Sequence, residues 1–164
     1  MKKGIALLFL ALCSILFTAC PVGLDHPLGR PGTEKLNENL IGTWYQPDDS
    51  FEMKLVEIKK LSDFTMHATV LEKTENYVPE VLEFKGWNTV LDGKNFMFFQ
   101  DANETGQFYL YCYELKGDVL TTWDVSLLVG GVDAVTSTEA FRQEVSASLK
   151  LPDCLTNMIT WKRI

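Results

Sequence analysis

The fold is decided by a stretch that begins at Gln107, ends at Leu128 and reads QFYLYCYELKGDVLTTWDVSLL. Aromatic and β-branched residues recur in two runs, 107–115 and 119–128, and this is the pattern of extended strands. Lys116-Gly117-Asp118 separates the runs, and Gly117 can adopt the positive φ that a tight turn requires. The stretch therefore predicts two antiparallel strands joined as a hairpin.

Similar runs occur along the chain upstream of this hairpin. Together with the hairpin they predict about eight short antiparallel strands, separated by turn residues such as Asp92 and Gly93. We expect these strands at residues 40–45, 51–58, 64–71, 81–85, 87–91, 94–100, 107–115 and 119–128, and a final strand at 158–164.

One late segment departs from the β pattern. Thr136 followed by Glu139 fits a capping box, and Phe141, Val145 and Leu149 recur four residues apart. This spacing predicts an amphipathic helix over residues 137–149 that lies on the surface of the domain.

These elements predict a mainly β fold, an antiparallel up-and-down β-barrel of about eight strands with one late amphipathic helix. Closure into a barrel is favoured because it removes exposed strand edges. An open antiparallel sheet packed on the helix, an α+β fold, is the alternative that the same periodicity allows.

The beginning of the chain has the features of an export signal. Lys2 and Lys3 precede an apolar run that ends at Phe17-Thr18-Ala19-Cys20. This resembles the lipobox of bacterial lipoproteins, with Phe17 at a position where Leu is usual. The resemblance implies that residues 1–19 are a signal peptide and that Cys20 becomes the acylated first residue of the mature chain. An ordinary cleaved signal or a marginal membrane anchor is the alternative.

A lipidated Cys20 implies attachment to the lipid bilayer in the bacterial cell envelope, and we expect the outer membrane, on its periplasmic or surface side. Residues 20–37 are rich in Pro and Gly and poor in apolar residues, so we expect a flexible tether there. Residues 38–164 then form the barrel domain.

The charge balance limits the partners. The chain of 164 residues has 22 acidic and 15 basic residues, a net charge of −7, and loss of Lys2 and Lys3 with the leader lowers it to −9. Such a surface repels phosphate backbones, so nucleic acid is not an expected partner. It would attract a basic protein, although acidity also simply keeps a domain soluble.

Two cysteines remain once Cys13 leaves with the leader and Cys20 carries lipid. In an oxidising compartment, Cys112 and Cys154 could form a disulfide. Two buried free thiols are the alternative.

A family resemblance begins at the first expected strand. Gly42-Thr43-Trp44 resembles the Gly-x-Trp motif that opens the first strand of lipocalins and fatty-acid-binding proteins. The resemblance implies that Trp44 closes the base of the barrel and that Arg163 stacks on its ring. The second lipocalin motif, a Thr-Asp-Tyr-like triplet, is absent. With the lipobox, the chain resembles the short lipocalin-like (calycin-type) lipoproteins of Gram-negative bacteria.

The sequence contains no nucleophile elbow, phosphate-binding glycine loop, metal-ligand spacing or His-based triad. His67 is the one histidine of the expected domain, and its position in the alternation turns it to solvent. We therefore expect a protein that is not an enzyme and that uses no metal or cofactor.

The middle of the chain is dense in aromatic residues, and its strands are apolar on both faces. The candidate ligand-binding residues are Tyr109, Tyr111, Tyr113, Phe98 and Trp123. The tyrosines share one strand face, and three hypotheses explain it. They could line a cavity for a small hydrophobic or amphipathic ligand. A solid barrel could instead bind a protein or glycan, for example as an envelope inhibitor of a basic hydrolase such as lysozyme. Finally, the tyrosines could simply cover the barrel under the helix.

Overall fold

The chain folds into a closed barrel of antiparallel strands. The computed structural model describes residues 23–47, 54–73, 79–103 and 106–164. Within these ranges every strand pairs with the next one along the chain, and the last pairs with the first. The strands are β1 (Gly42–Tyr45), β2 (Lys54–Lys60), β3 (Met66–Lys73), β4 (Pro79–Leu91), β5 (Lys94–Asp101), β6 (Phe108–Lys116), β7 (Val119–Val125) and β8 (Leu155–Arg163).

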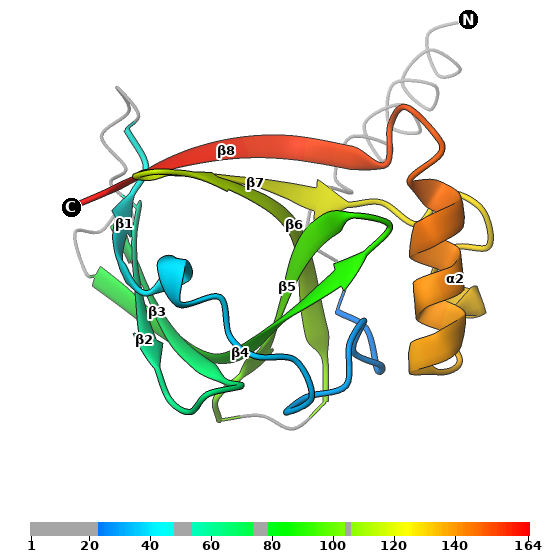
Figure 1. Cartoon of the computed structure of the whole chain (residues 1–164), viewed down its shortest axis with the longest axis horizontal. Coiled ribbons are helices and arrows are strands. Elements are labelled where there is room, and N and C mark those ends of the chain that lie inside the picture. The colour runs from blue at the N-terminus through cyan, green and yellow to red at the C-terminus, as the bar shows by residue number, and fades with distance from the viewer. Residues whose placement is uncertain (1–22, 48–53, 74–78, 104–105) are drawn as a thin grey trace, which may run out of the picture.

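The predicted up-and-down barrel is therefore confirmed, and the open sheet is wrong. In Figure 1 the strands form a ring, and the helix α2 (Thr138–Ser148) lies outside it. Two short 3-10 helices, η1 (Glu38–Leu40) and η2 (Val132–Ala134), precede β1 and α2. None of the helices in the described ranges is both long enough and apolar enough to cross a bilayer.

One predicted break between strands is wrong. Residues 81–85 and 87–91 were expected as separate strands, but they form the single strand β4. Gly86 lies in its middle and pairs with Met66 on β3 and Phe99 on β5. Gly86 does not end the strand. Because it has no side chain, it leaves room for the ring of Phe99.

The helix forms as predicted, with a different cap. The N-cap is Ser137, whose side chain accepts a hydrogen bond from the Ala140 amide at 3.1 Å, so the expected capping residue Thr136 lies one position too early. Phe141 and Val145 on the inner side of α2 are 1% and 0% exposed.

The apolar residues form two cores, one on each side of the strands. The inner core fills part of the barrel, and its buried members are Leu36, Leu40, Trp44, Ile58, Met66, Ala68, Met97, Tyr113 and Leu120. The outer core lies between the barrel wall and α2, and its buried members are Leu24, Leu28, Phe96, Phe98, Leu110, Cys112, Phe141 and Val145. Strands that are apolar on both faces therefore have a partner on both faces.

The expected flexible tether is wrong over its described part, residues 23–37. Leu24, Leu28 and Leu36 are 5%, 0% and 6% exposed. Leu24 also pairs with Phe108 at the start of β6 through two backbone hydrogen bonds of 3.0 and 2.7 Å. The Pro- and Gly-rich composition predicted a flexible segment, but a few well-spaced leucines and an extended backbone are enough to dock the segment on an apolar surface. Residues 20–22 lie outside the described ranges.

This docked segment is also held by polar contacts. Arg142 on α2 donates to the Leu28 carbonyl at 3.2 Å and to the Val90 carbonyl at 3.0 Å. The Glu34 carboxylate accepts hydrogen bonds from the Thr89 hydroxyl and from the Val90 amide. The segment, β4 and α2 are thereby joined outside the barrel.

Candidate functional site

The two ends of the barrel differ in how they are covered. At the closed end lie η1 and the tight turns between β2 and β3, β4 and β5, and β6 and β7. At the opposite end, which we call the mouth, lie the other strand connections, including the long one from β7 through α2 to β8. Residues 48–53, 74–78 and 104–105 of the mouth connections lie outside the described ranges.

The closed end is filled by side chains. Trp44, Met66 and Leu40 are completely buried there. The indole Nε1 of Trp44 donates to the Leu40 carbonyl at 2.8 Å, so the one polar atom of this ring is satisfied. This end therefore acts as the base of the barrel.

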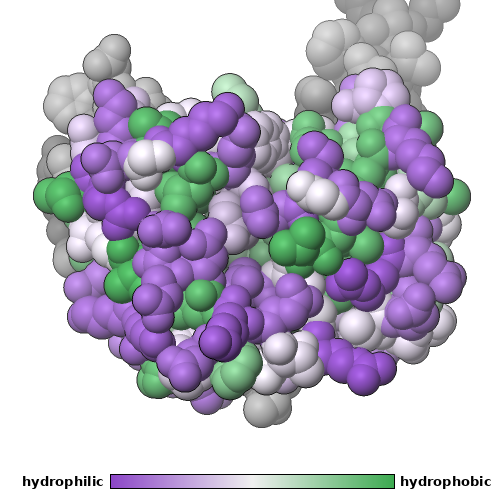
Figure 2. All heavy atoms as spheres, viewed as in Figure 1, coloured by the Kyte–Doolittle hydropathy of each residue, from purple (hydrophilic) through white to green (hydrophobic). Residues whose placement is uncertain are grey.

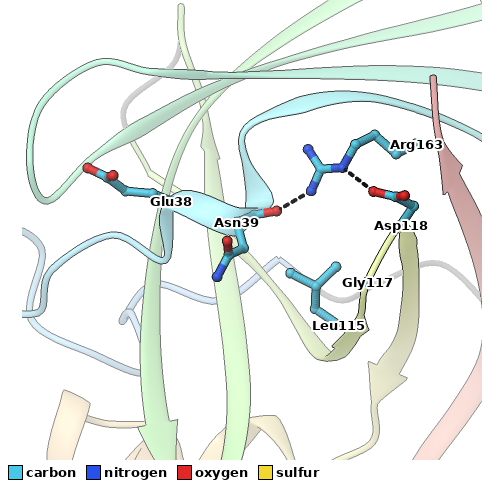
Figure 3. A pocket seen from close by; sticks show the side chains of 6 residues that line it. All are labelled: Glu38, Asn39, Leu115, Gly117, Asp118 and Arg163. Carbon is cyan, nitrogen blue, oxygen red and sulfur yellow. Dashed lines mark hydrogen bonds and ion pairs between the residues drawn. The ribbon is translucent and has the colours of Figure 1, made fainter.

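Arg163 covers the base from outside. Its guanidinium carbon lies 4.2 Å from the centroid of the Trp44 ring, so the stacking implied by the family resemblance is present. Its Nη2 donates to the Asn39 carbonyl at 2.6 Å, and its Nε lies 3.2 Å from Asp118 Oδ1 (Figure 3). Its Nη1 donates to the Ile41 carbonyl. Every guanidinium nitrogen is thus occupied by the protein itself.

Gly42 is required for this arrangement. Its φ is +143°, and a Cβ at this position would lie 2.5 Å from the Arg163 guanidinium. The hollow seen beside these residues is lined by Glu38, Asn39, Leu115, Gly117, Asp118 and Arg163 (Figure 3). The Arg163 guanidinium that lines this hollow is fully engaged by other groups of the protein. We therefore assign the hollow to the closure of the barrel and not to ligand binding.

Toward the mouth, the inner face carries a group of aromatic rings in mutual contact. We call it the aromatic wall, and it consists of Phe84 on β4, Phe99 on β5, and Tyr109 and Tyr111 on β6. Phe84 meets Phe99 and Tyr109 edge-on, with ring centroids 6.4 and 6.3 Å apart, and Phe99 meets Tyr111 in the same way at 6.2 Å. Edge-on contact is a favoured arrangement of aromatic rings.

The rings of the aromatic wall keep part of their surface exposed, unlike the side chains of the base. Gly86 helps to place them, since a Cβ on Gly86 would lie 2.5 Å from Phe99 Cε1. The wall combines ring surfaces with the hydroxyls of Tyr109 and Tyr111. Such a surface suits a molecule with an apolar body and a polar group.

Two of the predicted ligand-binding residues are part of this wall, Tyr109 and Tyr111. Tyr113 is on the same face but belongs to the base, where it is 4% exposed and its hydroxyl accepts a hydrogen bond from Asn37 Nδ2 at 3.2 Å. Burial raises the pKa of Tyr113. It is a structural residue that ties β6 to the residue before η1.

The other two predicted residues lie on the wrong side of the strands for a lumen. Phe98 and Trp123 both belong to the outer core beneath α2. Phe98 is 1% exposed and stacks on Trp87 at 5.6 Å between ring centroids. Phe84 and Phe99 of the aromatic wall were not among the predicted residues. Phe84 is recognised as an inward residue by its register opposite Ala68 and by its ring contacts.

The hypothesis that the tyrosines lie under the helix is also wrong. The face of β6 that meets the outer core carries Phe108, Leu110 and Cys112. Alternation along β6 then turns Tyr109, Tyr111 and Tyr113 to the interior.

The predicted disulfide is not formed. Cys112 and Cys154 are both free thiols and are 3% and 1% exposed. Cys154 Sγ donates to the Ser126 carbonyl at 3.5 Å, and burial raises the pKa of Cys112 to about 11. Each thiol behaves as a small buried apolar side chain, and Cys112 belongs to the outer core.

Other ionisable groups have structural roles. Glu144 on α2 accepts hydrogen bonds from the amides of Val129 at 3.0 Å and Gly130 at 2.9 Å, and from the Ser148 hydroxyl at 3.1 Å. Burial opposes its ionisation, but these hydrogen bonds outweigh burial and hold its pKa below the usual value. Among the described residues, no group of three or more His, Cys, Asp or Glu is arranged to hold a metal ion.

Comparison with models of protein families, with curated proteins and with solved structures found no match for the chain. The functional argument therefore rests on the barrel, its closed base and its partly exposed aromatic wall.

Proposed function

We propose that this protein is a non-enzymatic binding protein of the bacterial cell envelope, anchored to a membrane through acylated Cys20. Its ligand is a small hydrophobic or amphipathic molecule held inside the barrel against the aromatic wall. The observation that carries this proposal is the difference between the two halves of the barrel interior. The base is sealed, whereas the rings nearer the mouth keep exposed surface.

The two cores of the molecule provide the standard of comparison. In the outer core Phe96 and Phe98 are 0% and 1% exposed, whereas Trp87, Phe108 and Trp123 at its edge are partly buried. The rings of the aromatic wall are only half-buried although they face inward. Covering exposed apolar surface stabilises by about 25 cal/mol per Å², so a ligand that completes this burial gains affinity from the same effect.

Two neighbouring residues on β3 point to opposite faces of the barrel wall and allow the proposed ligand site to be tested. Val70 pairs with Val56 and Leu82 on the inner face toward the mouth, while Leu71 lies on the outer face and is 36% exposed. Val70→Trp places a bulky side chain inside the barrel, and Leu71→Trp places the same side chain outside it. The two variants therefore differ only in which face of the strand is enlarged.

The probe is cis-parinaric acid, an intrinsically fluorescent fatty acid, titrated into the folded protein. We expect saturable binding with a stoichiometry near one to the unmodified chain and to Leu71→Trp, and loss of saturation in Val70→Trp. Circular dichroism and a denaturation curve for each variant show that the barrel is intact. Equal binding by both variants, or no saturable binding by any folded form, overturns the proposal.

A negative result would favour the second hypothesis, in which the acidic surface binds a basic protein such as an envelope hydrolase. That complex should form with an on-rate that falls steeply with added salt, because charge steering is screened over about 10 Å at 0.1 M ionic strength.

A further inference from the structure

The position of Gly23 and Leu24 on the barrel limits how the barrel can sit on a membrane. Gly23 and Leu24 lie beside Gln107 and Phe108, at the mouth end of β6. Phe108 is the first residue of β6, and the other end of the strand leads into the turn at Asp118, which contacts Arg163 at the closed end. The docked segment then runs from the mouth toward η1, so Gly23, the first described residue, lies at the mouth.

Few residues separate Leu24 from the proposed anchor. Cys20 precedes Leu24 by four residues, and a fully extended chain of four residues spans at most about 14 Å. Leu24 itself is fixed to β6 by its two backbone hydrogen bonds. An acyl group on Cys20 would therefore hold the mouth, and not the closed end, next to the bilayer.

A second feature lies on the mouth side of the molecule. Residues 126–132 read SLLVGGV and carry no charge. Leu128, Val129 and Val132 within them are 42%, 62% and 45% exposed. Three neighbouring exposed aliphatic side chains without a charge among them form a surface of the kind that contacts a membrane or another protein.

The contacts of α2 place this loop at the mouth end. Arg142 and Ser146 on one side of the helix contact Val90 and Asp92, at the closed-end turn between β4 and β5. Glu144 and Ser148, on the opposite side, bind the amides of residues 128–131. The loop thus lies on the side of α2 that faces away from the closed end.

Charged contacts gather at the closed end. Ion pairs there join Lys60 to Glu38 and Asp63, Lys116 to Glu114, and Arg163 to Asp118. Hydrophilic residues also cover most of the face of the molecule that Figure 2 shows. A charged closed end is suited to water, and an uncharged loop is suited to the headgroup region of a bilayer.

We propose that the mouth of the barrel faces the bilayer and that residues 126–132 are its membrane-contacting loop. This inference rests on the proposed acylation of Cys20 and goes beyond it by assigning an orientation. An amphipathic ligand would then pass between the bilayer and the aromatic wall without crossing open water.

The test uses the full-length protein, purified from membranes and reconstituted into phosphatidylcholine vesicles. Val129→Cys and Leu61→Cys are labelled in turn with the environment-sensitive fluorophore NBD. Leu61 is the matched control, since it is also aliphatic and 58% exposed but lies in the closed-end turn between β2 and β3. Labelling of the unmodified chain gives the blank, which should be low because Cys112 and Cys154 are buried.

We expect blue-shifted NBD emission and loss of iodide quenching at position 129, and strong quenching by lipids that carry a nitroxide on the acyl chain. The label at position 61 should behave as in water. Mass spectrometry of the same samples reports acylation of Cys20. An acylated chain whose two labels are equally open to iodide overturns the orientation alone, whereas a chain without acyl groups overturns the anchoring and the orientation together.

Discussion

Gly86 and Phe99 are paired across β4 and β5 so closely that a Cβ on the glycine would lie 2.5 Å from the ring edge. The same Cβ would lie 3.0 Å from Met66 Cγ in the base. This glycine therefore sets the position of one ring of the aromatic wall while β4 continues through it. Its conformation is open to other residues, so a substitution tests the space alone.

Gly86→Ala should push the Phe99 ring out of its place and disturb its contact with Tyr111. We expect a loss of stability of about 1–3 kcal/mol, typical of overpacking, together with weaker binding of cis-parinaric acid. Gly106→Ala is the control, because no atom of the described residues, apart from its chain neighbours, lies within 4 Å of a Cβ at that position. If the two variants bind the probe equally, Phe99 does not form part of the binding surface.

Trp44→Ala should destabilise the barrel by about 3–5 kcal/mol, the usual result of emptying a large buried aromatic site. The ring is completely buried, and its loss also leaves Arg163 without its stacking partner. Urea denaturation followed by circular dichroism measures the change. A loss below about 1 kcal/mol would show that the base does not depend on this ring.

Leu28→Ala tests whether the N-terminal segment belongs to the domain. Leu28 is completely buried in the outer core, so its truncation should cost about 2–5 kcal/mol. Arg30→Ala, at an exposed position two residues away, should change stability by less than about 0.5 kcal/mol. Similar, negligible effects of the two substitutions would instead mean that the segment is a free tether in solution.

Glu144→Gln should make stability less dependent on pH. The pKa of Glu144 in the folded protein is lowered from the usual 4.5, so its ionised form stabilises the fold above that value. This contribution is lost as pH falls through the lowered folded pKa. We expect the variant to be less stable by about 1–3 kcal/mol at pH 7 and the difference to shrink in acid. A difference that is constant from pH 7 to strong acid would contradict an ionised Glu144.

The two buried thiols should react only after unfolding. With the pKa of Cys112 raised to about 11, roughly one molecule in a thousand carries its thiolate at pH 8. A thiol reagent should label neither cysteine in the folded protein and both in unreduced denaturant. Two unreactive positions in the denatured protein would indicate a disulfide.

The strand pattern predicted the barrel because alternation and turn glycines are local properties of the chain. It could not show which face of β6 was interior, since Tyr111 and Cys112 on opposite faces are both surrounded by apolar residues. Phe98 and Trp123 were assigned to a lumen for this reason. The docked N-terminal segment was missed on different grounds, because its partner, Phe108, lies 84 positions further along the chain.

The two-sided apolar wall has a consequence for how the barrel reaches its native register. A slip of one residue in β6 would exchange Tyr111 for Cys112 between inside and outside, and hydrophobicity alone would penalise the error weakly. Docking of the segment around Leu28 and of α2, which close over the outer face, would favour the correct pairing over the slipped one. These two elements are more than a hundred residues apart in the sequence, so both can dock only after the intervening strands are available. Until both have docked, the apolar outer face of β5 and β6 stays uncovered, and such a surface is prone to aggregation.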